Sequence, residues 1–226
     1  MRMLGVFEKN ERVRHIGHLD IQRAVQRGLR RSGLPVAYSN GFNPHILVSF
    51  ASALSTGSCG KKEIMDVRMA EDVNEEEFLI RMNAAMPPEM QLSAARAVDD
   101  HHPALTACLK AGTYEMRFRN SAQADRLISA IEPMMMRETI PVMRKTKKGI
   151  SEVDMKPLII SLRGEKTTLY ATLTLTEKES CKPGMIIEGL KKEAGIPENE
   201  EVGMLVIRTG LLGEAADGLL VPLESL

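Results

Sequence analysis

The fold is decided by the stretch from Arg12 to Phe50, which reads RVRHIGHLDIQRAVQRGLRRSGLPVAYSNGFNPHILVSF. Its apolar residues recur at i, i+3, i+4, i+7 and i+8, the spacing that places one apolar stripe on a helix: Ile21, Ala24, Val25, Gly28 and Leu29. The stripe predicts a helix that buries this face. We expect the helix to begin at Gly17 or His18 and to end at Gly33, because glycine readily adopts the left-handed conformation that closes helices.

A second face of this predicted helix carries arginine. Four residues recur at i, i+4, i+7 and i+8 and therefore share that face: Arg23, Arg27, Arg30 and Arg31. Their guanidinium groups repel one another unless water solvates them or a polyanion neutralises them, and phosphate fits the planar guanidinium fork. Arg12 and Arg14 extend the basic run. All six are candidate phosphate contacts, and an ordinary solvated helix surface is the alternative.

A polar and aromatic loop follows the helix. Ser39-Asn40-Gly41 is a turn signal, and Phe42-Asn43-Pro44-His45 leads into a short strand over residues 46–50. A rigid turn can direct side chains outward, as binding loops require, so Asn43 and His45 are candidate ligand contacts. The alternative is turn chemistry alone, with Asn43 held extended by Pro44.

Two histidines, His15 and His18, lie three residues apart near the start of the helix, where they could share one side. Histidine can transfer protons near neutral pH, and with His45 the two could also form a metal cluster. The spacing supplies no Asp, Glu or Cys ligand set, so structural or capping roles are favoured. We assign neither catalysis nor a metal to them and keep them as candidate RNA contacts.

The segment HIGHLDIQRAVQRGLRRSGLPVAYSNGFNPHILVSFASALSTG resembles the opening signature of a bacterial family of unknown function. Members of that family occur as radical-SAM-associated proteins, free-standing or fused behind a radical-SAM domain. The later segment KTKKGISEVDMKPLI is similar to the family pattern in the second half of the chain. The resemblance implies a radical-SAM protein as partner and no established activity.

Composition excludes a globally basic protein. The 226 residues hold 30 Lys plus Arg and 30 Asp plus Glu, so affinity for a polyanion requires uneven placement. From Lys9 to Phe50 there are seven basic and two acidic residues, whereas the charged residues of Glu71 to Glu77 are all acidic. With 43% hydrophobic residues the chain can fill a core in two domains of about 100 residues each.

The three cysteines, Cys59, Cys108 and Cys181, contain no CxxC or zinc-like spacing. We therefore expect reduced thiols, no iron–sulfur or zinc site and no cofactor. No stretch approaches 18 uninterrupted apolar residues, and the first residues contain no signal-like apolar region. The expectation is a cytoplasmic protein without membrane contact.

The order of expected elements in the first half is β-α-β-β-α-β, with strands near residues 2–8, 46–50, 63–69 and 91–98 and a second helix capped by Asn74. The second half repeats that order, with Pro133 ending one helix, Pro183 opening another and a hairpin turn at Gly164-Glu165. The predicted fold class is α+β with two tandem ferredoxin-like units. They cover residues 1–98 and 104–226, separated by Asp99 to Pro103, and residues 211–226 stay unplaced.

A basic segment lies between two expected strands of the second unit, from Arg144 to Gly149. Its basic residues could lie at a solvated loop tip or form a second set of phosphate contacts. They are Arg144, Lys145, Lys147 and Lys148. Tandem sheets with basic loops suit nucleic acid. The chain has only eight aromatic residues and no tryptophan, so its sheet faces lack the aromatic platform of an RNA-recognition motif.

Three classes of function fit these patterns. The first is a non-catalytic accessory of a radical-SAM enzyme that binds structured RNA, such as tRNA or rRNA, through the basic helix. The second is a metal-independent RNA-cleaving enzyme that uses His15 or His18. The third is a protein-interaction module with Met134-Met135-Met136 on its surface. The sequence contains no self-contained catalytic motif, so we rank the accessory first.

Overall fold

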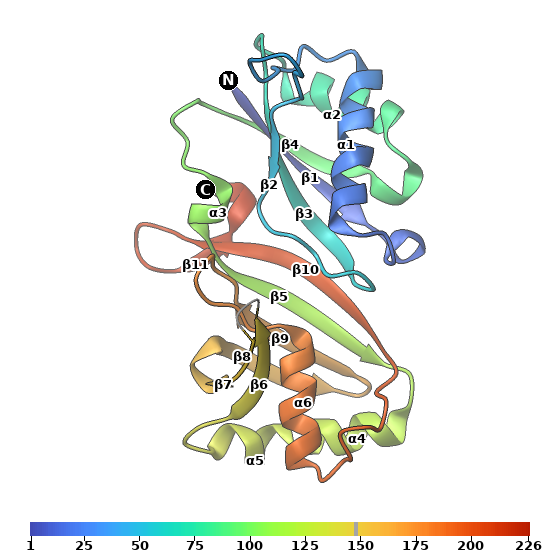
Figure 1. Cartoon of the computed structure of the whole chain (residues 1–226), viewed down its shortest axis with the longest axis vertical. Coiled ribbons are helices and arrows are strands. Elements are labelled where there is room, and N and C mark those ends of the chain that lie inside the picture. The colour runs from blue at the N-terminus through green and yellow to red at the C-terminus, as the bar shows by residue number, and fades with distance from the viewer. Residues whose placement is uncertain (147–148) are drawn as a thin grey trace. The chain divides into compact units, whose positions relative to one another are not determined.

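The computed structural model describes residues 1–146 and 149–226 and divides them into two compact units (Figure 1). Unit 1 comprises Met1–Leu109 and Gly210–Leu226, and unit 2 comprises Lys110–Thr209. Both units combine helices with antiparallel strand pairs. The predicted domain bounds were 1–98 and 104–226, whereas the compact units meet at residue 109 and the C-terminal residues count with unit 1.

Unit 1 begins with a strand and combines strands with three α-helices, α1, α2 and α3, among its described residues. In chain order its elements are β1 (Arg2–Lys9), a 3-10 turn (Glu11–Val13), α1 (His18–Ser32), β2 (Val48–Phe50), β3 (Cys59–Arg68), α2 (Glu75–Ala85), a 3-10 turn (Pro88–Met90), β4 (Leu92–Val98), α3 (Leu105–Cys108), the end of β10 (Met204–Glu214), β11 (Leu220–Pro222) and a 3-10 turn (Leu223–Ser225).

Strand β1 is the centre of the unit 1 sheet. It pairs antiparallel with β3, from Arg2 opposite Arg68 to Val6 opposite Ile64, and antiparallel with β4 on its other side. Strand β2 pairs antiparallel with β3, so four strands follow the order β4-β1-β3-β2. In addition, β11 pairs antiparallel with the end of β10.

Helices α1 and α2 pack against each other and share a core with one face of this sheet (Figure 1). The predicted stripe of α1 is confirmed, because Ile21, Val25 and Leu29 are buried. A Cβ at Gly28 would lie 2.5 Å from the sulfur of Met86, so glycine permits the close approach of the segment after α2. The buried residues of this core are Met3, Phe7, Ile21, Val25, Leu29, Leu34, Val36, Ile46, Met65, Val67, Met69, Val73, Phe78, Met82, Met86, Met90 and Leu92.

Both helix ends of α1 follow the sequence prediction. Gly17 is the N-cap, and Gly33 closes the helix with φ of 64°, a left-handed conformation that glycine adopts without a Cβ clash. In α2, the side chain of Asn74 accepts hydrogen bonds from the backbone of Glu76 and Glu77, which confirms the predicted cap.

The elements of unit 2 follow the order strand, helices, strands, helix and strand, which resembles the order in unit 1. A β-hairpin is inserted after the first two helices. Its elements are β5 (Leu109–Phe118), α4 (Ser121–Ser129), α5 (Ile131–Met136), β6 (Pro141–Thr146), β7 (Gly149–Asp154), a 3-10 turn (Lys156–Leu158), β8 (Ile159–Glu165), β9 (Thr168–Thr174), α6 (Pro183–Glu193) and the first part of β10.

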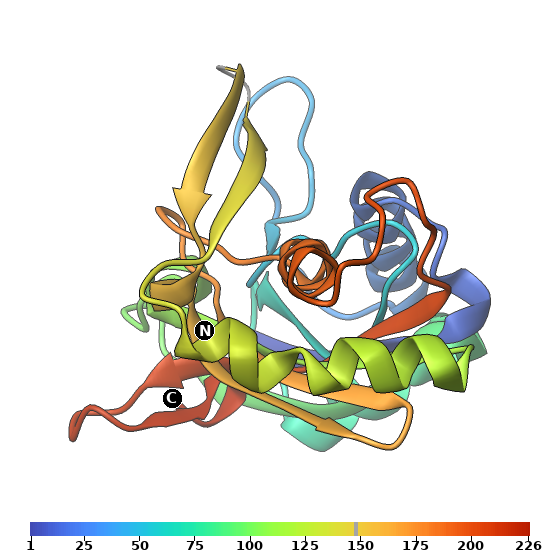
Figure 2. The same ribbon diagram turned by 90° about the horizontal axis from the view of Figure 1, so that it is seen from below.

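The sheet of unit 2 follows the order β10-β5-β9-β8. Strand β9 pairs antiparallel with both β5 and β8, and the hydroxyl of Thr209 in β10 donates to that of Thr113 in β5 at 2.8 Å. The β6–β7 hairpin forms a separate two-stranded sheet that projects away from α4 and α5 (Figure 2).

Two predicted details of unit 2 differ from the structure. Pro133 does not end the helix: α4 already stops at Ser129, and Pro133 lies in the first turn of α5, where its missing N–H costs no helical bond. The hairpin turn lies at Lys166-Thr167 rather than Gly164-Glu165, with Lys166 at φ of 53°. Strand β10 continues to Glu214 and so includes the first of the residues 211–226 that the sequence left unplaced.

The cap of α2 gives a test of this local reasoning. Replacing Asn74 by alanine removes the acceptor for two amide groups, so Asn74→Ala should lower the free energy of unfolding by about 1 kcal/mol. Asn74→Asp keeps the acceptor oxygen and should retain wild-type stability in the same urea titration. Equal losses for both variants would contradict the capping role.

Candidate functional site

The arginine face of α1, defined by Arg23, Arg27, Arg30 and Arg31, is exposed to solvent along its whole length. Arg23 forms an ion pair of 3.0 Å with Asp20, and Arg31 donates to the carbonyl oxygen of Ala85, the last residue of α2. Within residues 1–146 and 149–226, Arg27 and Arg30 have no hydrogen bond or ion pair. Two of the four cations are therefore free to bind an anion.

The flanking residues before α1 are arranged less uniformly. Arg14 pairs with Glu11 at 2.9 Å, whereas Arg12 is 85% exposed and its nearest carboxylate, Glu89, is 3.7 Å away. His15 is exposed. Among these three, Arg12 and His15 keep polar atoms open to solvent, while Arg14 is mostly committed to its local ion pair.

His18 is packed inside unit 1 rather than presented to a ligand. Its ring lies edge-on to Phe50 with centroids 5.4 Å apart, and its Nε2 is 3.2 Å from the side-chain nitrogen of Gln22. It lines a small pocket with the buried residues Lys9 and Glu63. The pocket holds about 10 Å³, roughly the space that one water molecule needs, so it has no room for a substrate.

The loop from Tyr38 to Ile46 is closed by local bonds. Tyr38 pairs with Ile46, the amide of Ser39 donates to the carbonyl oxygen of His45 at 2.8 Å, and the His45 ring nitrogen Nδ1 is 2.8 Å from the Ser39 hydroxyl. Asn43 and His45 are both exposed. His45 therefore braces the loop, and Asn43 projects from it.

The alternative of a metal cluster formed by His15, His18 and His45 finds no support among the described residues. His18 contacts Phe50 at the last residue of β2, whereas His45 precedes the first residue of that strand. In the described part of the chain, no three His, Cys, Asp or Glu side chains are grouped as metal ligands would be.

In the basic segment of unit 2, Arg144 and Lys145 belong to β6. The guanidinium of Arg144 donates to the hydroxyl of Ser180 at 3.4 Å. The side chain of Lys145 and the residues Lys147 and Lys148 lie outside the described part of the structure. The prediction of a second phosphate contact here remains a prediction.

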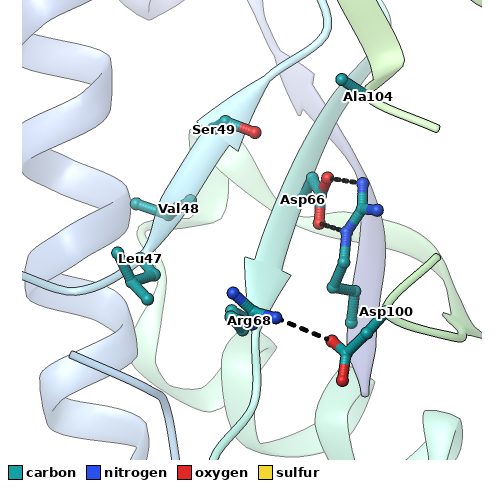
Figure 3. A pocket seen from close by; sticks show the side chains of 8 residues that line it. Leu47, Val48, Ser49, Asp66, Arg68, Asp100 and Ala104 are labelled. Atoms are coloured by element: carbon teal, nitrogen blue, oxygen red, sulfur yellow. Dashed lines mark hydrogen bonds and ion pairs between the residues drawn. The ribbon is translucent and has the colours of Figure 1, made fainter. Parts of the chain in front are cut away.

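A cleft of about 410 Å³ lies in unit 1 beside β2 and β3 (Figure 3). Its charged walls form two ion pairs: Arg2 holds Asp66 through two hydrogen bonds, and Arg68 lies 3.5 Å from Asp100. The bonds from Arg2 to Asp66 raise the pKa of the Arg2 guanidinium. The remaining lining residues are Leu47, Val48, Ser49 and Ala104.

The two ion pairs of the cleft differ in exposure, and exposure decides their energies. The side chains of Arg2 and Asp66 are 13% and 8% exposed, whereas those of Arg68 and Asp100 are about half exposed. Removing one partner of a buried pair leaves an uncompensated charge, while an exposed pair contributes little. The Arg2–Asp66 pair is thus structural, and Arg68 is the cation of the cleft that a ligand can reach.

We predict that Asp66→Ala lowers the free energy of unfolding by about 3 kcal/mol, because Arg2 loses its buried carboxylate. Asp100→Ala removes the exposed partner of Arg68 and should cost at most about 1 kcal/mol. Urea unfolding followed by circular dichroism measures both. Similar losses in the two variants would show that burial does not separate these pairs.

The three cysteines are free thiols in different environments. Cys59 and Cys181 are buried, and Cys108 is partly exposed. Burial raises the pKa of the Cys59 thiol and raises that of Cys181 to about 12. At neutral pH these two thiols are therefore poor nucleophiles.

We expect a disulfide reagent at pH 8 to modify one thiol per native chain rapidly and the other two only upon unfolding. Cys108→Ser should abolish the rapid phase, because Cys59 and Cys181 stay buried and protonated. Absorbance of the released thiol gives the number of cysteines modified. Rapid modification of all three in the native protein would contradict the burial of Cys59 and Cys181.

Sequence reasoning missed several residues that shape this region. Lys9 and Glu63 are buried charged residues, and no regular spacing in the sequence predicts their burial. The ammonium of Lys9 donates a hydrogen bond to the carbonyl oxygen of Arg14 at 2.8 Å. Phe42 is fully exposed at the tip of the loop, although an aromatic residue beside a turn is ordinarily expected to pack. The turn signal Ser39-Asn40-Gly41 was the one available sign that Phe42 lies at a tip.

Comparison with known proteins gives a match to a protein family. The family model described as "Uncharacterized protein conserved in bacteria (DUF2344)" matches residues 2–183. No curated protein matches the chain. Among the helices that the structure describes, none has the length and apolar character needed to cross a membrane.

Proposed function

The chain belongs to this bacterial family of uncharacterized proteins, and we propose that its unit 1 binds structured RNA through phosphate groups on the arginine face of α1. In this proposal the protein is a non-catalytic accessory. The resemblance of its opening signature to radical-SAM-associated proteins supports a radical-SAM enzyme as partner. Such a complex would modify or process the bound RNA in the cytoplasm.

One observation carries the proposal: Arg27 and Arg30 are exposed on the same face of α1 and have no partner among the described residues. Guanidinium groups bind phosphate oxygens through parallel hydrogen bonds, which makes arginine suited to this contact. The arginine face extends over about 12 Å of helix, since each residue adds about 1.5 Å. That length can meet more than one phosphate of a folded RNA.

The strand order supports a finer description of the scaffold. The order β4-β1-β3-β2 in unit 1 and the order β10-β5-β9-β8 in unit 2 place corresponding strands of the two units in the same positions. We propose that each is a ferredoxin-like unit, the second with an inserted β6–β7 hairpin. The helices of such a unit cover one sheet face, which leaves their outer surfaces for binding.

An RNA-cleaving enzyme is the second candidate, because His18, Lys9 and Glu63 share one pocket. A histidine near a carboxylate and an ammonium group is a combination that general acid–base catalysis uses. The pocket accommodates about one water molecule, however, and the His18 ring is engaged by Phe50 and Gln22. The present arrangement therefore favours binding over cleavage.

The third candidate, a protein-interaction module, was expected to bind its partner through Met134-Met135-Met136. Met134 is buried in the core of unit 2, and Met135 packs against that core. Met136 is 78% exposed. A single exposed methionine is a smaller apolar surface than a stable protein interface needs, so this class ranks below the other two.

We predict that Arg27→Glu combined with Arg30→Glu weakens binding of all structured RNAs and flattens the dependence of log affinity on log salt by roughly two units, because about 0.7 to 0.9 units are lost for each phosphate contact. The stability of the variant should match wild type, since both positions lie off the buried stripe of α1. Filter binding at several salt concentrations measures affinity and slope together.

Two controls separate the candidates. Lys178→Glu combined with Lys192→Glu makes the same change in net charge on exposed residues of unit 2 and should leave the slope unchanged. His18→Ala should keep both RNA affinity and any cleavage at wild-type levels if the protein is an accessory, whereas a nuclease would keep binding and lose cleavage. Wild-type protein without salt-dependent RNA affinity would disprove the proposed function.

A further inference from the structure

We infer that the loop from Tyr38 to Ile46 recognises an unpaired RNA nucleotide by stacking its base on the ring of Phe42. The inference rests on the proposed RNA binding and adds the kind of RNA structure that is bound. The arginine face accounts for phosphate contacts, which do not distinguish paired from unpaired RNA. A stacking residue makes that distinction, because only an unpaired base exposes both of its faces.

Phe42 is the most exposed large apolar side chain of the described structure, with a relative exposure of 112%. Gly41 before it has φ of 118°, a conformation that only glycine adopts readily, and Pro44 follows two residues later. The loop below is braced by the Tyr38–Ile46 pair and by the bonds between Ser39 and His45. The ring is therefore held outward by the backbone rather than left on a loose segment.

The surroundings of Phe42 favour a base over a protein partner. A protein interface centres on a contiguous apolar patch, but the neighbours of Phe42 along the loop are polar: Ser39, Asn40, Asn43 and His45. A planar base needs one ring for stacking and hydrogen-bonding groups at its edge, and the exposed side chain of Asn43 lies next to Phe42. Tyr38, 47% exposed, adds a second ring at the base of the loop.

The base of the loop also holds a cation. Arg68 at the end of β3 is bonded through its backbone to Ala37 on one side of the loop and to Leu47 on the other. Its guanidinium is about half exposed and lies 3.5 Å from the carboxylate of Asp100 (Figure 3). It can therefore contact a phosphate group of the RNA strand whose base stacks on Phe42. The loop starts shortly after the C-terminal end of α1, where Arg30 and Arg31 lie.

The test compares two RNAs of equal length, a hairpin with an unpaired loop that contains 2-aminopurine and a blunt duplex. Phe42→Ala should weaken binding to the hairpin by roughly 5- to 150-fold, the usual effect of losing one stacked base, and leave duplex binding unchanged. Phe42→Trp should restore hairpin binding and the fluorescence quenching of 2-aminopurine. Leu219→Ala, at an exposed apolar residue of the β10–β11 turn, is the matched control and should change neither.

The outcomes distinguish the two proposals. If the wild type binds both RNAs with a salt slope that Arg27→Glu and Arg30→Glu flatten, but Phe42→Ala binds like wild type, the loop inference is wrong and phosphate binding stands. Equal losses on hairpin and duplex would also overturn it. If wild type binds neither RNA, both proposals fail. If Phe42→Ala abolishes binding of a protein partner and leaves RNA affinity unchanged, Phe42 contacts a protein rather than an RNA base.

Discussion

The packing of α1 on the sheet of unit 1 is the constraint on which the candidate surface depends. Ile21, Val25 and Leu29 enter the core beside β1 and β3, and each such side chain stabilises the fold by about 1.5 to 3 kcal/mol when buried. Burial of this stripe leaves the helix no rotational freedom about its axis. The arginines on the other side must therefore face solvent, although their mutual repulsion would favour dispersing them.

Positive and negative charges of this protein balance in number but lie at different places on its surface. The chain is neutral as a whole. Acidic residues such as Asp66 in the cleft and Asp20 in the first turn of α1 already form ion pairs with other arginines. Within the described structure, Arg27 and Arg30 therefore have no acidic partner. Because exposed charges are screened beyond about 8 to 10 Å in physiological salt, a polyanion senses this local excess and not the zero net charge. Neutral composition and phosphate binding are thus compatible.

The sequence predicted those features that periodicity and caps determine. The buried stripe of α1, its end at Gly33 and the cap at Asn74 follow from local rules that the tertiary structure reinforces. The extent of β10 and the placement of the C-terminal residues could not be predicted, because strand pairing across the whole chain decides them. In the candidate site, exposure of the arginines was predictable from the helix pattern. Burial of Lys9 and Glu63 and exposure of Phe42 were not, since they depend on which loops cover which positions.

Unit 1 is assembled from both ends of the chain, and this has a consequence for its synthesis. Leu223 near the C-terminus is buried, and Glu224 binds Lys62 on β3 and accepts a bond from Arg96 on β4. A ribosome that has finished Leu109 must add more than 100 further residues before these contacts can form, about 5 to 20 s at typical bacterial rates. During that interval the nascent unit exposes the apolar surface that Leu223 later covers. The N-terminal half is therefore completed only after residues 210–226 have been synthesised, in the reverse of the usual N-to-C order.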